Sequence, residues 1–249
     1  MDVVAELRAA GCVFAEEEAA LLVASADPAD LSALVRRRCA GEPLEHLLGF
    51  VEFCGRRYRV SPGVFVPRQR SALLVETAGR IGGAVVLDLC CGCGALGLAV
   101  RAQLGAGIRL VATDLDPLAV ADARANGVTE AYVGDLFAPL PRDLRGTVDL
   151  LIANTPYVPS EAIAAMPPEA REHEPRTALD GGPEGIRVQR RVLAEASDWL
   201  APDGVLLTET STSQAPLLCD VARRSGWSMR VLRDDERGAT VVAATLRQT

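Results

Sequence analysis

The sequence contains no apolar run of about 18 residues or more, the length that an α-helix needs to cross a bilayer. Residues 1–6 also lack the basic region and the apolar core of a secretory signal peptide. Both absences predict a soluble, cytoplasmic protein that has no membrane partner.

The chain also has fewer positively than negatively charged residues. The chain carries 26 Lys and Arg against 33 Asp and Glu, which gives a net charge of -7 and an isoelectric point of about 5.0. Proteins that hold nucleic acid by neutralising many phosphates need the opposite balance. We therefore expect no stable binding to nucleic acid, although a local basic patch is compatible with this composition.

Histidine occurs twice, and the seven cysteines are an odd number. Cys90 and Cys93 have the spacing of metal ligands but no second ligand pair, so we expect no bound metal. An odd number of cysteines in an intracellular chain also disfavours a disulfide framework. We expect the cysteines to act as small, mostly buried apolar residues, with thiol–disulfide chemistry at Cys90 and Cys93 as the alternative.

Apolar residues are abundant, at 49% of the 249 residues, which is enough for one large domain and a small appendage. Residues 1–48 have apolar residues at helical spacing and predict a small helical domain for substrate docking. In it, Asp27 is the expected N-cap of a helix that has Pro28 at its first position. The basic run 36–38 suits the end of that helix, with an RNA or ribosome contact as the alternative.

From residue 49 the pattern changes. Alternating residues predict a β-hairpin linker over 49–70 that turns near Gly55, and residues 71–249 then alternate apolar strands with helices. The expected strands are 85–89, 109–113, 131–133, 148–153, 205–210, 229–232 and 240–246. The expected helices are 71–80, 116–126, 186–200 and 216–225, together with one that follows the glycine turn 90–97.

This order predicts an α/β fold with a seven-stranded, doubly wound sheet, which binds its ligand beyond the carboxyl ends of the strands. The last two strands are close enough to form a hairpin, so one of them would run antiparallel in an otherwise parallel sheet. The proline-rich segment 159–183 is long for a loop and predicts either a functional lid or disorder.

A glycine-rich turn follows the first strand of the large domain. Gly92, Gly94 and Gly97 permit a sharp reversal and a close backbone approach to a ligand. Asp114 lies 20 residues after Gly94 at the end of the next strand, where it suits both ribose hydroxyls of a nucleoside cofactor. After the third strand, Asp135 and Leu136 suit an adenine amino group and ring, with an ordinary surface turn as the alternative.

The strand at 148–153 ends in a turn whose side chains suit a planar NH2 group. An amide offers a donor and an acceptor, the carbonyl before a proline is a second acceptor, and an aromatic ring can stack on a planar face. A strand that ends in a proline turn is the structural alternative. The four residues are Asn154, Thr155, Pro156 and Tyr157.

With its glycine turn and Asp114, the chain resembles class I S-adenosylmethionine-dependent methyltransferases. Within them it is similar to the PrmC/HemK family of protein-(glutamine-N5) methyltransferases, which modify the Gly-Gly-Gln loop of peptide-chain release factors. The resemblance covers nearly the whole length. Besides the turn at 154–157, it rests on residues 41–49, 53–55, 65–68 and 174–185.

The resemblance implies S-adenosyl-L-methionine as the cofactor, a release factor as the protein partner, and a monomer. The implied cofactor-binding residues are Asp88, Cys90, Cys91, Gly92, Cys93, Gly94, Asp114, Leu115, Asp135, Leu136 and Asn154. The implied substrate-binding residues are Phe65, Pro67, Arg68, Asn154, Thr155, Pro156 and Tyr157, of which the last four are also the implied catalytic residues.

The chain departs from the family pattern at three places. Thr155 replaces a proline, Cys90 replaces the first glycine of the cofactor loop, and residues 69–72 read Gln-Arg-Ser-Ala where the family has Pro-Glu-Thr-Glu. Two other functions suit the same residues. One is methylation of the N6 of adenine in DNA or RNA, which needs base extrusion and a basic groove. The other is a regulator that binds the cofactor without catalysis.

Overall fold

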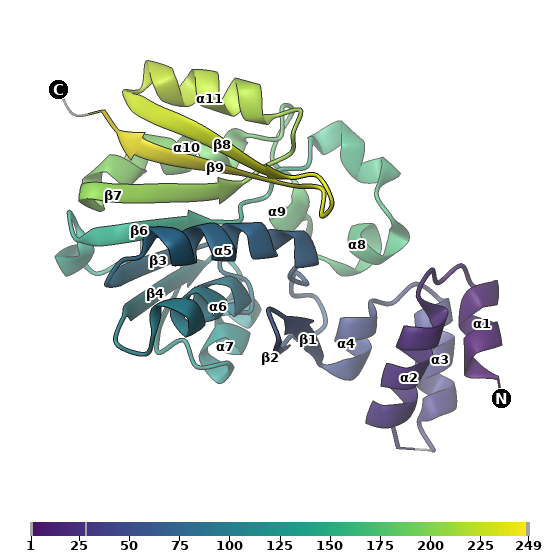
Figure 1. Cartoon of the computed structure of the whole chain (residues 1–249). Helices are drawn as coiled ribbons and strands as arrows, with labels where there is room; N and C mark the ends of the chain where they lie inside the picture. The colour runs from purple at the N-terminus through teal and green to yellow at the C-terminus, as the bar shows by residue number, and fades with distance from the viewer. Residues whose placement is uncertain (1, 28, 248–249) are drawn as a thin grey trace.

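The computed structural model of the protein describes residues 2–27 and 29–247, so Met1 and Pro28, which the sequence analysis used, lie outside it. Four helices begin the chain and share a core that includes Leu7, Leu22 and Val35. They are α1 (Val3–Ala9), α2 (Ala15–Ser25), α3 (Leu31–Cys39) and α4 (Leu44–Leu48). In Figure 1 this helical unit lies beside the sheet domain and is joined to it through α4 and a hairpin.

The N-cap of α3 is Asp30 and not Asp27, so that prediction was wrong. The carbonyl of Asp27 accepts bonds from the backbone N–H groups of Asp30 and Leu31, which makes a turn before the helix begins. The basic run in the last turn of α3 is divided between solvent and interior. Arg36 is exposed, whereas Arg38 is 6% exposed and pairs with Glu18.

The predicted hairpin is confirmed, with β1 (Phe50–Phe53) and β2 (Arg56–Arg59) paired antiparallel. Its apolar side chains Val51, Phe53 and Tyr58 are buried in the same core as one face of the large sheet. The hairpin therefore packs on the sheet domain, and its position fixes where the following segment, with Phe65, meets the ends of the strands.

The predicted seven-stranded sheet is also confirmed, in the order β5-β4-β3-β6-β7-β9-β8. All neighbours are parallel except for β9, which runs antiparallel to β7 and β8. The strands are β3 (Val85–Leu89), β4 (Arg109–Asp114), β5 (Glu130–Val133), β6 (Val148–Ala153), β7 (Leu200–Glu209), β8 (Trp227–Asp234) and β9 (Ala239–Leu246).

Helices cover both faces of this sheet (Figure 1). One face packs against α5 (Ala72–Ile81), α6 (Ala95–Leu104) and α7 (Pro117–Ala125), and the other against α10 (Arg187–Glu195) and α11 (Ala215–Arg224). Successive residues of β3 alternate between these faces, since Val86 belongs to the first core and Leu87 to the second. No helix in the described part of the chain is long and apolar enough to span a membrane.

Most predicted bounds agree with the structure to within one or two residues, and two regions differ more. The helix expected over 186–200 ends at Glu195 and is followed by η4 (Ala196–Asp198), while β7 begins at Leu200 and not at residue 205. The segment 159–183, expected as a lid or as disorder, contains η3 (Ser160–Ala165), α8 (Pro168–His173) and α9 (Arg176–Leu179). Short 3-10 turns also occur at η1 (Gln69–Ser71) and η2 (Arg142–Leu144).

The strand order reverses beside β3. The chain runs from β3 outward to β4 and β5, and then returns to place β6 on the other side of β3. The carboxyl ends of these four strands meet at one edge, which is where doubly wound sheets bind ligands. The topology thus brings together the turn after β3, Asp114, Asp135 and Asn154.

Candidate active site

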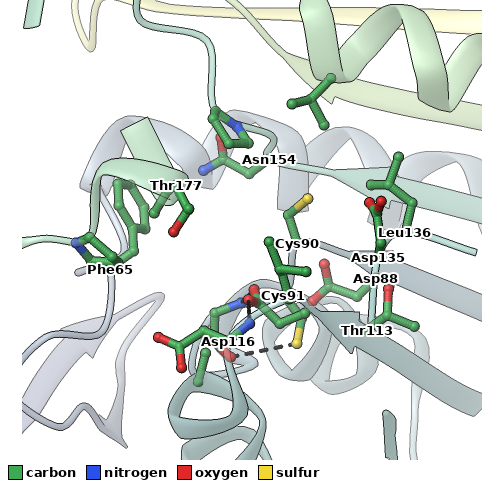
Figure 2. A pocket seen from close by; sticks show the side chains of 18 of the residues that line it. Phe65, Asp88, Cys90, Cys91, Thr113, Asp116, Asp135, Leu136, Asn154 and Thr177 are labelled. Atoms are coloured by element: carbon green, nitrogen blue, oxygen red, sulfur yellow. Dashed lines mark hydrogen bonds between the residues drawn. The ribbon is translucent and has the colours of Figure 1, made fainter. Parts of the chain in front are cut away.

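A cavity of about 510 Å³ lies at this edge of the sheet (Figure 2). That volume is in the range of small-molecule sites. In Figure 2, Phe65 and Thr177 stand on one side of the cavity and Asp135 and Leu136 on the other, with Asn154 between them. Residues from segments far apart in the sequence therefore surround a single space.

The floor of the cavity is the turn between β3 and α6. Cys90 (φ 56°), Gly92 (φ 55°) and Gly94 (φ 78°) all have left-handed backbone conformations, which explains the glycines and makes Cys90 a strained substitution for one. A Cβ on Gly94 would lie 2.9 Å from Cγ2 of Val128, so no larger residue fits there. The turn is held by the Cys91 N–H, which donates to the Thr113 carbonyl at 3.0 Å.

Asp114, at the end of β4, is anchored through both of its carboxylate oxygens. Oδ2 accepts from the Gly92 N–H at 2.8 Å, and Oδ1 accepts from the Asp116 N–H at 2.9 Å. Each oxygen retains a lone pair for a further donor. Burial raises the pKa of Asp114 above its usual value, and the two backbone donors oppose that shift. The carboxylate is therefore fixed in place at the wall of the cavity.

Asp88 is deeper, at 1% exposure, and its Oδ2 accepts from the Gly97 N–H at 3.0 Å. Burial raises the pKa of Asp88 to about 7. Burial also raises the pKa of the Cys93 thiol to about 12 and lifts those of Cys90 and Cys91 above their usual values. These thiols stay protonated at neutral pH, which disfavours the thiol–disulfide alternative.

The far wall belongs to the turn after β5. Leu136 is 5% exposed and adopts φ 49°, while Asp135 is paired with Arg191 of α10 at 2.8 Å. Leu115 is 58% exposed and lines the mouth of the cavity. This part of the lining thus combines the apolar side chains of Leu115 and Leu136 with the carboxylate of Asp135.

The turn after β6 presents Asn154 to the cavity (Figure 2). Its Nδ2 donates to Oγ of Ser71 at 3.3 Å, whereas no residue in the described part of the chain donates to its side-chain oxygen. Thr155 is 2% exposed, and its Oγ1 is a buried hydroxyl oxygen without a partner in the described structure. Pro156 lines the cavity beside Asn154.

Tyr157 is not in the lining of the cavity, and its hydroxyl is engaged in two hydrogen bonds. The hydroxyl donates to Oε1 of Glu209 at 2.9 Å and accepts from Nη2 of Arg70 at 2.7 Å. Burial and the neighbouring Glu209 raise the pKa of Tyr157 to about 12. The ring is therefore held neutral and in one orientation.

Phe65 and Pro67 line the cavity, and Arg68 supports this wall from behind. The Arg68 guanidinium lies 5.0 Å from the centre of the Phe65 ring and pairs with Glu174 at 2.7 Å. The Glu174 carboxylate also accepts from the Val66 N–H at 3.2 Å. Glu174, from the end of α8, thereby ties the long segment after β6 to the wall.

The cavity is thus lined by most, but not all, of the residues singled out in the sequence. Those that line it are Phe65, Pro67, Asp88, Cys90, Cys91, Gly92, Cys93, Asp114, Leu115, Asp135, Leu136, Asn154 and Pro156. Those that are not in its lining are Arg68, Gly94, Thr155 and Tyr157. Sequence reasoning missed Thr177, Arg187 and Arg191, because no local pattern marks α9 and the start of α10 as cavity walls.

Three comparisons with known proteins bear on this site. Residues 57–169 match the family described as "Methyltransferase small domain". The release factor glutamine methyltransferase of Geobacter sulfurreducens is 36% identical over 222 residues, which cover 85% of this chain and 77% of that protein. The protein of the same description from Gloeobacter violaceus is 38% identical over 217 residues, which cover 82% of this chain and 75% of that protein.

Among solved structures, the ribosomal protein L11 methylase from Lactobacillus delbrueckii subsp. bulgaricus has a similar fold, with a TM-score of 0.55 and 15% sequence identity. The match covers 77% of this chain and 86% of that chain. At this identity the similarity concerns the fold alone.

Proposed function

The chain belongs to the release factor glutamine methyltransferase family, and we propose that it methylates the side-chain amide nitrogen (N5) of a glutamine in the Gly-Gly-Gln loop of a peptide-chain release factor. The observation that carries the proposal is the orientation of Asn154. Its Nδ2 donates to Ser71, its oxygen receives no hydrogen bond from the described residues, and Asn154 lines a cavity whose volume suits a nucleoside-sized ligand.

The residues present suit S-adenosyl-L-methionine, which would supply an electrophilic methyl group. The glycine turn leaves room for close approach, since a Cβ built on Gly92 meets nothing nearer than 4.0 Å. The fixed carboxylate of Asp114 suits the ribose hydroxyls, and Leu115 and Leu136 suit the faces of adenine. Asp88, Cys90, Cys91 and Cys93 complete the floor.

In the proposed reaction, the chain aligns the substrate amide nitrogen with the methyl group. The lone pair of an amide nitrogen is delocalised, so the nitrogen must be held on the line of attack. The Asn154 side-chain oxygen and the Thr155 carbonyl would accept the two N–H hydrogens, and Phe65 would wall the glutamine pocket. No strong base is needed, because the nitrogen becomes acidic when it is alkylated and one N–H proton then passes to water.

The helical unit 1–48 would dock the protein substrate. A groove of about 490 Å³ between this unit and α8 supports that role, and its lining includes Phe14, Arg38 and Glu169. Arg38 contacts Glu169 at 2.5 Å, which joins the helical unit to the segment that follows the active-site turn. Phe14 is 64% exposed and offers an apolar contact beside this groove.

The proposal is tested with Asn154→Ala. Loss of the aligned acceptor should lower the rate of methyl transfer at least about a hundredfold. The measurement is transfer of labelled methyl from S-adenosyl-L-methionine to a purified release factor, with circular dichroism and the midpoint of thermal unfolding as the controls for folding. Near-normal turnover in the variant would refute the mechanism.

The same assay in cell extract separates the other two functions. Label on a protein of release-factor size supports the proposal, and label that disappears after nuclease treatment supports adenine methylation. Cofactor binding without transfer to protein or nucleic acid supports the silent regulator.

A further inference from the structure

Two consecutive residues of η1, Arg70 and Ser71, contact both functional side chains of the turn 154–157. Ser71 is fully buried, and its Oγ accepts from Nδ2 of Asn154 at 3.3 Å. An asparagine amide can rotate so that oxygen and nitrogen exchange places, and only one of the two orientations presents an acceptor. A serine hydroxyl can accept or donate, and here it accepts from Nδ2 and holds the amide in the orientation in which no described residue donates to the Asn154 oxygen.

Arg70 holds the other end of the turn. Its Nη2 donates to the Tyr157 hydroxyl at 2.7 Å, and its Nε donates to Oε1 of Glu209 at 3.2 Å. Because the Tyr157 hydroxyl also donates to that same oxygen at 2.9 Å, the three groups form a closed triangle. Glu209 is 1% exposed, and its Oε2 has no hydrogen-bond partner among the described residues. The guanidinium is therefore the cation that compensates this buried carboxylate.

The backbone of Tyr157 is fixed as well. Its carbonyl accepts from Nε2 of Gln214 at 2.7 Å. With the carbonyl held from one side and the hydroxyl from the other, the ring has little freedom left. Arg70 also lines the groove beside the helical unit, so it lies between the proposed docking groove and the active-site turn.

We propose that Arg70 and Ser71 form a positioning pair for methyl transfer, with Ser71 holding the Asn154 amide in place and Arg70, with Glu209, setting the orientation of the Tyr157 ring. The inference deepens the proposed function and rests on it for the identity of the acceptor. It gives a role to the stretch 69–72, which departs from the family pattern. Neither residue lines the cavity, so both act through the turn.

The Ser71 half is tested by the Asn154 amide itself. Asn126 and Asn154 are the two asparagines of the chain, so asparagine-selective ¹⁵N labelling gives two side-chain NH2 pairs, and the pair lost in Asn154→Ala identifies Asn154. In Ser71→Ala the Asn154 pair should shift and exchange with solvent at least about fivefold faster. The Asn126 pair is the internal reference, because it donates to the Arg59 and Cys93 carbonyls at 2.9 Å.

Activity gives the second readout for Ser71. Ser71→Ala should lower kcat about threefold to tenfold at unchanged S-adenosyl-L-methionine affinity, because one neutral hydrogen bond is lost at the acceptor end of the site. Ser71→Thr keeps the hydroxyl and should restore kcat to within about twofold. Ser228→Ala, on an exposed position of β8, is the matched control.

The Arg70 half is tested with a double-mutant cycle. Arg70→Gln should lower kcat about tenfold in the wild-type background and less than about twofold in Tyr157→Phe, where the hydroxyl is already absent. Each kcat is expressed per cofactor-binding molecule, so that a general loss of folded protein is not counted. Arg230→Gln, at an exposed position of β8, is the control for loss of an arginine.

An Asn154 amide signal that does not respond to Ser71→Ala would overturn the Ser71 half. An equal cost of Arg70→Gln in both backgrounds would overturn the Arg70 half. If the wild-type protein methylates no glutamine in any release factor while its Asn154 signal responds to Ser71→Ala, the proposed function fails and the contact by which Ser71 holds the amide stands.

Discussion

Asp88 offers a test of how the cofactor cradle affects stability. The carboxyl group is buried at the end of β3 and receives one backbone hydrogen bond, from Gly97. Burial raises its pKa from 3.8 to about 7. The folded protein therefore binds the Asp88 proton more tightly than the unfolded chain does, and ionisation of Asp88 destabilises the fold.

The sign of the pH dependence follows from this. Stability from protonated Asp88 is fully present below about pH 4 and is lost as the pH rises towards 7, at about 1.4 kcal/mol per pH unit. The whole loss is roughly 4 kcal/mol, of which roughly 3 kcal/mol falls between about pH 5 and pH 8. Asp88→Asn removes the titration and keeps an oxygen that can accept from the Gly97 N–H.

The assay is urea unfolding of the wild-type and Asp88→Asn proteins at about pH 5 and pH 8, without cofactor. Relative to the wild type, the variant should gain roughly 3 kcal/mol in the free energy of unfolding between the two pH values. Asp235→Asn, at an exposed turn, removes the same charge and should show no such gain. Equal pH dependence in the wild-type and Asp88→Asn proteins would refute the reasoning.

Two further changes test how the cavity is built. Glu174→Ala removes the acceptor of the buried Val66 N–H and of the Arg68 guanidinium, and should lower the free energy of unfolding by about 2 kcal/mol, measured with urea, because a buried N–H is left unpaired. An unchanged midpoint would mean that this pair does not hold the Phe65 wall. Gly94→Ala should cost about 2 kcal/mol through its positive φ and the contact with Val128, while Gly105→Ala, which also has a positive φ but open space, should cost less. Equal costs for the two variants in thermal unfolding would contradict the contribution of the Val128 contact.

Local sequence was sufficient to predict most strands and the glycine turn. The run 148–153 is continuous and apolar because β6 is buried on both faces, and its predicted bounds are those observed. Helical periodicity gave the wrong prediction for residues 196–200, which were expected to continue the helix that ends at Glu195. There Leu200 pairs with Val148 in the sheet, and these ladder contacts end the helical pattern five residues earlier than the sequence indicates.

The long segment 159–183 is another case in which local pattern was insufficient. Its prolines disfavour a regular element, yet tertiary contacts hold short helices there. Asp180 accepts from the Ser160 hydroxyl and from the Gly182 N–H, and the Val158 N–H donates to the Leu179 carbonyl. The contacts from Ser160 to Asp180 and from Val158 to Leu179 join residues about 20 apart, beyond the range of turn and helix signals.

The sequence by itself determined the sheet and the cavity floor, because strand periodicity, glycine turns and an acid at fixed spacing are properties of neighbouring residues, while its motifs carried the resemblance to the family. Only the tertiary structure decided how Asn154 and Tyr157 are oriented. Arg70 and Glu209 are 139 residues apart and meet because β6 lies next to β7 and η1 lies beside their carboxyl ends. Contacts of that range depend on strand order and packing, and no local pattern of residues encodes them.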